Sequence, residues 1–195
     1  MRFTRPLMLV ATALRLALAV VPADAQMFGT ASTAEKTVKV GGAQMSPSKN
    51  IIENTVNSKV HTTLVAALRA AGLVEILEGP GPFTVFAPTN GAFDKLPPDT
   101  VETLMKPENK AALAKILTYH VVPGRLTAGN LRKMVKEGNG SAILKTVEGD
   151  RLTVTQEGDK LFISGEKSGV AEVSIPNVLQ SNGVVHVITS VVQPN

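Results

Sequence analysis

The chain has 195 residues, 44% of them hydrophobic, with 20 Lys and Arg against 16 Asp and Glu, one Tyr, no Trp and no Cys. This length and hydrophobic fraction suit one domain with its own core and exclude a disordered chain. The lack of Cys excludes disulfides, zinc–thiolate and iron–sulfur sites and a thiol nucleophile, and the lack of Trp leaves few rings for stacking on sugars or bases.

Residues 1–25 have the layout of a cleavable secretory signal peptide. Two arginines precede an apolar stretch from Leu7 to Val21, which is shorter than the roughly 20 apolar residues of a spanning helix. Ala23-Asp24-Ala25 forms a small-residue cleavage site, so we expect a cut after Ala25 rather than an uncut membrane anchor. The mature chain should be periplasmic or extracellular, with no transmembrane segment.

Cleavage at this site also changes the charge of the protein. It removes three Arg and one Asp, so the formal net charge falls from +4 to +2. No run of Lys and Arg remains that could neutralise a row of phosphates, and we therefore expect no nucleic-acid partner.

Residues 26–46 are rich in Gly, Ala, Ser and Thr, and we expect a flexible leader with one short extended piece. A single domain is expected over 47–195, with a first half that is mainly helical. Ser46-Pro47 is typical of a helix start, and Gly72 of a helix stop. The expected elements of this half are helices over 50–56, 60–71, 97–105 and 107–120, a turn over 79–82 and a strand over 83–87.

The second half is expected to be a meander of antiparallel strands. Glu148-Gly149-Asp150 and Glu157-Gly158-Asp159 repeat one turn tripeptide between segments that alternate apolar and polar residues, and Asn182-Gly183 is the strongest hairpin signal of the chain. Helices first and strands later predict an α+β fold. The expected strands cover 142–147, 152–155, 161–164, 177–181 and 184–188.

No catalytic or metal-binding motif is found in the sequence. The Gly-x-Ser-x-Gly nucleophile turn is absent, and the three histidines do not have metal-ligand spacing, so we predict no enzymatic activity, no cofactor and no metal. His120 and His186 lie in apolar segments, where a hydrogen-bonded structural histidine is favoured over a metal or acid–base role. His61 is expected to be an exposed helix cap.

Three segments, in order and correctly spaced, resemble the conserved boxes of the fasciclin domain family. They are residues 81–93 (GPFTVFAPTNGAF), 119–124 (YHVVPG) and 181–188 (SNGVVHVI), and the resemblance covers about residues 47–194. It implies a fasciclin-like wedge of about seven mostly antiparallel strands in two sheets, with helices packed alongside and a helix-rich N-terminal half. It also implies an extracellular protein without known enzymatic activity, usually active in cell adhesion or matrix binding.

The resemblance also implies candidate binding residues. In animal members the Tyr-His motif and its branched neighbours have been linked to integrin contact, and an Asp-Ile pair ahead of the last box is a second adhesive determinant. Here Asn replaces that Asp, so the carboxylate of the pair is lost. The candidate binding residues of this chain are Tyr119, His120, Val121, Val122, Asn177 and Val178.

Two alternatives remain open for the Tyr-His motif and two for the function. Because His120 and Leu117 share an apolar helix face, we favour the motif as a core element over a contact surface. We predict a non-enzymatic, secreted module for cell adhesion or for interaction with a surface or matrix, whose partner is a cell-surface or matrix protein or a polysaccharide. The alternative is a small-ligand-binding protein of the cell envelope.

Overall fold

The computed structural model describes residues 37–97 and 99–194. The expected signal peptide and the first part of the expected leader lie outside the described residues. The strands are β1 (Val38–Val40), β2 (Ala43–Met45), β3 (Phe83–Pro88), β4 (Val121–Pro123), β5 (Ser141–Lys145), β6 (Arg151–Glu157), β7 (Lys160–Ser164), β8 (Val170–Gln180) and β9 (Gly183–Ile188). The helices are α1 (Ile51–Thr55), α2 (Thr62–Ala71), α3 (Val74–Glu78), α4 (Asn90–Phe93), α5 (Thr100–Met105), the short 3-10 helix η1 (Pro107–Asn109), α6 (Lys110–Tyr119) and α7 (Ala128–Glu137).

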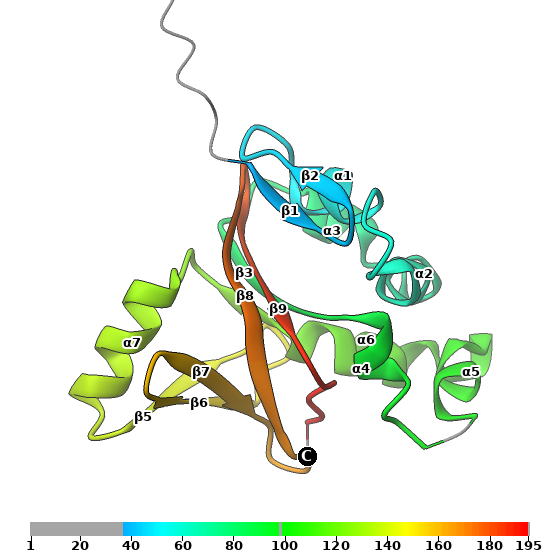
Figure 1. The fold of residues 1–195 in the computed structure, drawn as a ribbon. Helices are drawn as coiled ribbons and strands as arrows, with labels where there is room; N and C mark the ends of the chain where they lie inside the picture. The colour runs from blue at the N-terminus through cyan, green and yellow to red at the C-terminus, as the bar shows by residue number, and fades with distance from the viewer. Residues whose placement is uncertain (1–36, 98, 195) are drawn as a thin grey trace, which may run out of the picture. The chain divides into compact units, whose positions relative to one another are not determined.

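Within the described residues, seven strands form one sheet in the order β4-β3-β9-β8-β7-β6-β5, and β1 and β2 form a separate pair (Figure 1). Neighbouring strands run antiparallel except β3 and β9, which run parallel. The first residues of β8 pair with β7, and after Val173 its pairing with β9 is irregular as far as Val178. Such bulges bend a strand, and β8 thereby connects the two halves of the sheet. These strands and helices confirm the expected α+β fold class.

The predicted helix stop at Gly72 is confirmed, whereas the predicted helix start at Ser46-Pro47 is wrong. Gly72 ends α2 in the left-handed conformation, with φ of 73°, as predicted. The first helix does not begin at Ser46-Pro47. Asn50 is its cap, because Asn50 and Glu53 form a capping box in which each side chain accepts the other residue's backbone N–H at 2.8 Å. Helix α7 was not among the expected elements, although Thr127 and Asn130 form a second capping box at its start.

The predicted hairpin at Asn182-Gly183 is present, but its turn lies one residue earlier. Gln180 pairs with Gly183, so Ser181 and Asn182 form the turn. Gly183 is already in β9, where an added Cβ would lie 2.2 Å from the carbonyl oxygen of Phe83 in β3. Glycine at this position therefore permits the close approach of two strands rather than a turn conformation.

The β1–β2 hairpin corrects the expectation of a flexible leader up to residue 46. Val40 and Met45, at its two ends, are 1% and 4% exposed and belong to the hydrophobic core. The backbone N–H of Ser46 also donates to the side chain of Asn54 in α1. The domain boundary that we expected at residue 47 from composition therefore lies too late in the chain, since β1 and β2 pack on the domain. Composition missed these strands because short strands of mixed composition give almost no periodic signal.

Two hydrophobic cores lie on the two faces of the central strands. The first core joins α1, α2, α3 and α6 to β3 and β9, and the second joins α7 to β5, β6, β7 and β8. Alternate residues of β3 serve both cores, since Val85 and Ala87 belong to the first and Phe86 to the second. The segment that carries the Tyr-His motif passes between these cores.

Candidate functional site

The predicted binding residues lie at two places on the sheet. Tyr119 ends α6, His120 is its C-cap, and the two valines after it open β4. Asn177 and Val178 lie in the irregular part of β8. Tyr119, His120, Val121, Val122 and Val178 are each 5% exposed or less, and of the six predicted residues only Asn177 is exposed. The burial of the Tyr-His motif agrees with the core alternative of the sequence analysis.

The phenol of Tyr119 is held inside the second core. Its hydroxyl donates to the carbonyl oxygen of Arg151 at 2.5 Å, and burial raises the pKa of the phenol above its usual value of 10.0. The ring is 0% exposed. Tyr119 therefore joins the end of α6 to β6 and presents no atom to a partner protein.

His120 joins the end of α6 to the C-terminal segment. Its Nδ1 lies 2.8 Å from the carbonyl oxygen of Ile116, so Nδ1 carries the proton and donates. Its Nε2 accepts the backbone N–H of Val192 at 3.2 Å. Both bonds suit the neutral ring, and burial lowers the pKa of His120 to about 4. A second proton, on Nε2, would point at the N–H of Val192 and break this hydrogen bond. His120 therefore links α6 to the C-terminal segment only as a neutral ring.

Asn177 is part of a second histidine-centred connection. His186 lies within β9, donates from Nε2 to the carbonyl oxygen of Leu126 at 2.8 Å and accepts the backbone N–H of Asn177 on Nδ1. The side-chain oxygen of Asn177 accepts the N–H of Ala128 at the start of α7, and its φ of 59° is one that Asn tolerates better than most residues. Asn177 thus positions α7, and no hydrogen bond between described residues joins it to the Tyr-His motif.

His61 differs from the expectation of an exposed cap. It precedes α2 but is only 2% exposed, with Nδ1 at 2.9 Å from the hydroxyl of Ser58. That hydroxyl also donates to the carbonyl oxygen of Val40 in β1, so the N-terminal hairpin covers this region. In the part of the chain that the structure describes, Nε2 has no hydrogen-bond partner, and burial lowers the pKa of the ring to about 4.

A small apolar site with about 20 Å³ of free space lies beside the Tyr-His motif, between α2, α3, the end of α6, β3, β4 and the turn after β5. We call it the α3–β4 groove. Its two rim residues, Ile76 and Val147, are large apolar side chains that are 53% and 44% exposed. Its walls are formed by Leu68, Leu73, Ile76, Leu77, Phe83, Leu117, Thr118, Val121 and Val147, none of them charged.

The sequence analysis did not find the α3–β4 groove. Ile76 and Val147 are 71 positions apart and line the same site only through tertiary packing. Val147 is held beside β4 because its backbone N–H donates to the carbonyl oxygen of Val121 at 2.8 Å. Of the predicted residues, the groove contains Val121, which is 5% exposed at its floor. In the sequence, the groove is marked only by Ile76 and Val147, two apolar residues with polar neighbours. Single apolar residues at the surface are so common that such positions do not predict a site.

Among the described residues, no cluster of three or more His, Asp or Glu side chains could hold a metal ion. The same part of the chain contains no helix that is both long and apolar enough to cross a bilayer.

Comparison with known proteins agrees with the boxes found in the sequence. The model of the fasciclin domain matches residues 59–194. Protein sll1483 of Synechocystis sp. is 44% identical over 162 residues, which cover 83% of each chain. The immunogenic protein MPB70 of Mycobacterium bovis is 38% identical over 147 residues, which cover 71% of this chain and 65% of the relative.

A solved structure shows the same fold. The pair of FAS1 domains from the insect cell adhesion molecule fasciclin I superposes with a TM-score of 0.67 at 20% sequence identity, covering 76% of this chain and 52% of the insect chain. The chain described here thus spans about half of that pair. From the matched residues, the relatives and this fold, the chain belongs to the fasciclin domain family.

Proposed function

We propose that this protein is a secreted, non-enzymatic adhesion module that binds a cell-surface or matrix component. Membership of the fasciclin domain family supports the proposal, together with the likeness in fold to domains of an insect cell adhesion molecule. The signal-peptide layout of residues 1–25 supports export to the periplasm or beyond.

The observation that carries the proposal is the exposed apolar rim of the α3–β4 groove. Ile76 and Val147 leave about half of their side chains in water, above walls that carry no charge. The two side chains line one uncharged site, and contiguous apolar surface of this kind is typical of interaction sites, whereas single exposed apolar residues are not. The mature chain has a formal net charge of only +2, so contact through shape and apolar area fits it better than contact through charge.

The Tyr-His motif supports this surface from beneath. Val121 contributes to the floor of the groove, while Tyr119 and His120 fix the end of α6 to β6 and to the C-terminal segment. Asn177 and Val178 stabilise the attachment of α7 and the bulge of β8. We propose that the motif residues act on adhesion by positioning this surface, without touching the partner.

The walls of the groove also favour one class of partner. Phe83 is the one aromatic residue among them, and it is only partly exposed. Binding of polysaccharide commonly uses stacking on exposed rings, whereas branched apolar side chains suit a protein surface. We therefore favour a surface or matrix protein over a polysaccharide.

A double variant tests the proposal. The mature chain is coated on a surface, and attachment of the producing cells is counted for the wild type and for Ile76→Lys/Val147→Lys. We expect attachment of the double variant to be weaker by about tenfold or more, because each substitution places a charge where an apolar contact of at least about 1 kcal/mol is made. The free energy of unfolding should change by about 0.5 kcal/mol or less per site, as is usual for exposed positions.

Val170→Lys is the matched control. Val170 at the start of β8 is 63% exposed and does not line the groove, so it allows the same replacement of an apolar side chain by a charged one at a different place on the surface. Its attachment should equal that of the wild type. Equal attachment of the double variant and the control would overturn the role of the groove, and no attachment of wild-type protein above an albumin coat would overturn adhesion itself.

A further inference from the structure

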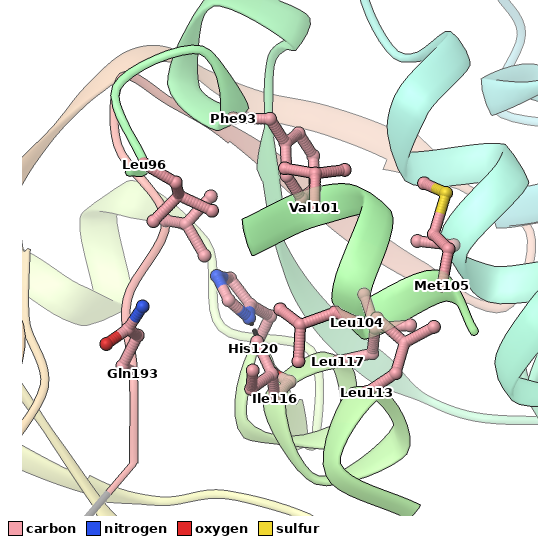
Figure 2. A pocket seen from close by; sticks show the side chains of 12 residues that line it. Phe93, Leu96, Val101, Leu104, Met105, Leu113, Ile116, Leu117, His120 and Gln193 are labelled. Atoms are coloured by element: carbon pink, nitrogen blue, oxygen red, sulfur yellow. Dashed lines mark hydrogen bonds between the residues drawn. The ribbon is translucent and has the colours of Figure 1, made fainter. Parts of the chain in front are cut away.

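A second apolar site lies under α5, away from the rim of the α3–β4 groove. We call it the α5 pocket (Figure 2). Val101, Leu104 and Met105 of α5 form its cover, and side chains from α2, α4 and α6 form its walls. The segment after β9 closes one end, where Gln193 lies near Leu96 and His120. The α5 pocket shares one wall residue, Leu117, with the groove.

The chemistry of the walls restricts what the α5 pocket can bind. Every lining residue is apolar except His120 and Gln193, and no Asp, Glu, Lys or Arg side chain lines the pocket. Burial lowers the pKa of His120 to about 4, so this ring is also neutral at ordinary pH. A charged ligand would lose its hydration without gaining a counter-charge, which costs several kcal/mol in general. The site therefore suits a neutral ligand.

One polar group of the pocket is free to bind a ligand. Both ring nitrogens of His120 are already bonded, one to Ile116 and one to Val192. The side-chain amide of Gln193 makes no hydrogen bond to another described residue, and Gln193 is only partly exposed. A ligand with one hydrogen-bonding group at its end would satisfy this amide while its hydrocarbon part lies against α5 and α6.

The α5 pocket is closed in this structure. The free space inside it is about 20 Å³, enough for about one water molecule, although about 420 Å³ lies between its walls when the part open to solvent is counted. Ligand sites commonly measure about 300–1,000 Å³. A ligand therefore enters only if part of the wall moves.

Helix α5 is the element that can move. It has six residues, none of them fully buried, and its cap residue Asp99 makes no side-chain capping bond. Helices of this length are not stable without packing, and segments with few buried contacts open at low free energy. Pro97 and Pro107 flank the segment, so neither end continues into a neighbouring α-helix without a break.

We propose that the α5 pocket binds a small, neutral, mostly hydrocarbon molecule with one hydrogen-bonding group at its end, and that α5 is the lid that opens to admit it. The amide of Gln193 binds the polar end, and the side chains of Leu104 and its neighbours on α5 repack around the apolar part. This site does not depend on adhesion, since the proposed partner surface is formed by the rim of the other groove.

The experiment uses 1-naphthol and naphthalene as probes, with the mature chain labelled with nitrogen-15. Both probes are neutral and share one hydrocarbon skeleton, and only 1-naphthol has a hydroxyl group. We expect saturable binding of one molecule per chain, with amide shifts concentrated in α5, α6 and residues 191–193. The wild type should bind 1-naphthol about two- to tenfold more tightly than naphthalene, the range of one net hydrogen bond. In Gln193→Leu this preference should disappear.

Two tryptophan variants on α5 complete the test. Leu104→Trp places a large ring in the pocket and should weaken binding of both probes by tenfold or more. Thr103→Trp places the same ring on the exposed side of the same helix and should leave binding unchanged. Probe shifts spread over the surface without saturation, or equal affinities of the two tryptophan variants, would overturn the site. A preference for 1-naphthol that survives in Gln193→Leu would overturn the role of Gln193.

Discussion

At the scale of single residues, the Tyr-His motif is defined by the buried hydrogen bonds of its two side chains. Tyr119 is the last residue of α6 and His120 is its C-cap, and each makes a hydrogen bond to a backbone atom that is distant in the sequence. An aliphatic residue at either position would leave a buried carbonyl oxygen or N–H without a partner, which costs about 1–3 kcal/mol. The buried hydrogen bonds of the motif thus contribute to the stability of the fold.

His120 gives a prediction for the pH dependence of stability. Its pKa in the folded protein is about 4, against 6.5 for an unperturbed histidine. Between these pH values the unfolded chain binds a proton that the folded chain does not, so the free energy of unfolding falls as the pH falls, by about 3 kcal/mol in total from this residue. More than about one pH unit above 6.5 both states are neutral and the contribution to the pH slope vanishes.

The variant His120→Gln should therefore be less stable than the wild type at pH 8, by about 1–3 kcal/mol, and the difference should shrink towards pH 4. Urea unfolding followed by circular dichroism at several pH values measures both effects. Tyr119→Phe is the control, because it removes a neighbouring buried hydrogen bond without a group that titrates in this range. Parallel pH curves for wild type and His120→Gln would contradict the assignment.

At the scale of elements, the short N-terminal hairpin has more influence than its composition indicates. β1 and β2 have three residues each, yet Val40 and Met45 are buried in the first core and the hairpin covers His61. The sequence analysis treated the segment as a leader because Gly, Ala, Ser and Thr dominate it. Burial of two residues at the ends of two short strands cannot be recognised from periodicity.

We expect Met45→Ala to lower the free energy of unfolding by about 2–5 kcal/mol, as for other buried large-to-small changes. Gln44→Ala, on the exposed side of the same strand, should change it by about 0.5 kcal/mol or less. Chemical unfolding of the mature chain measures both variants. A small effect of Met45→Ala would mean that the hairpin is not part of the cooperative domain.

At the scale of the whole described domain, two cores share one set of strands. The alternation of buried residues along β3 and β9 links the helical first core to the second core under α7. Neither core can lose its packing without exposing the strands that support the other. The two halves recognised in the sequence, helices first and strands later, are therefore not two folding units.

This arrangement predicts one cooperative unfolding transition. Leu64→Ala in the first core and Leu152→Ala in the second should each lower the same single melting temperature, with losses of about 2–5 kcal/mol. Scanning calorimetry and circular dichroism should give coincident transitions for both variants. A second transition in either variant would show that the cores unfold independently.

The sequence by itself determined the α+β class, the family, the stop of α2 at Gly72 and the hairpin before β9, because caps, turns and boxes are local features. The tertiary structure alone decided which side chains meet water. It covered His61 with a hairpin from the expected leader and exposed Ile76 and Val147 at one groove, and it buried Tyr119 and His120, for which the sequence had only favoured a core position. Burial depends on contacts between residues far apart in the chain, and such contacts form only when the whole sheet and its helices pack together.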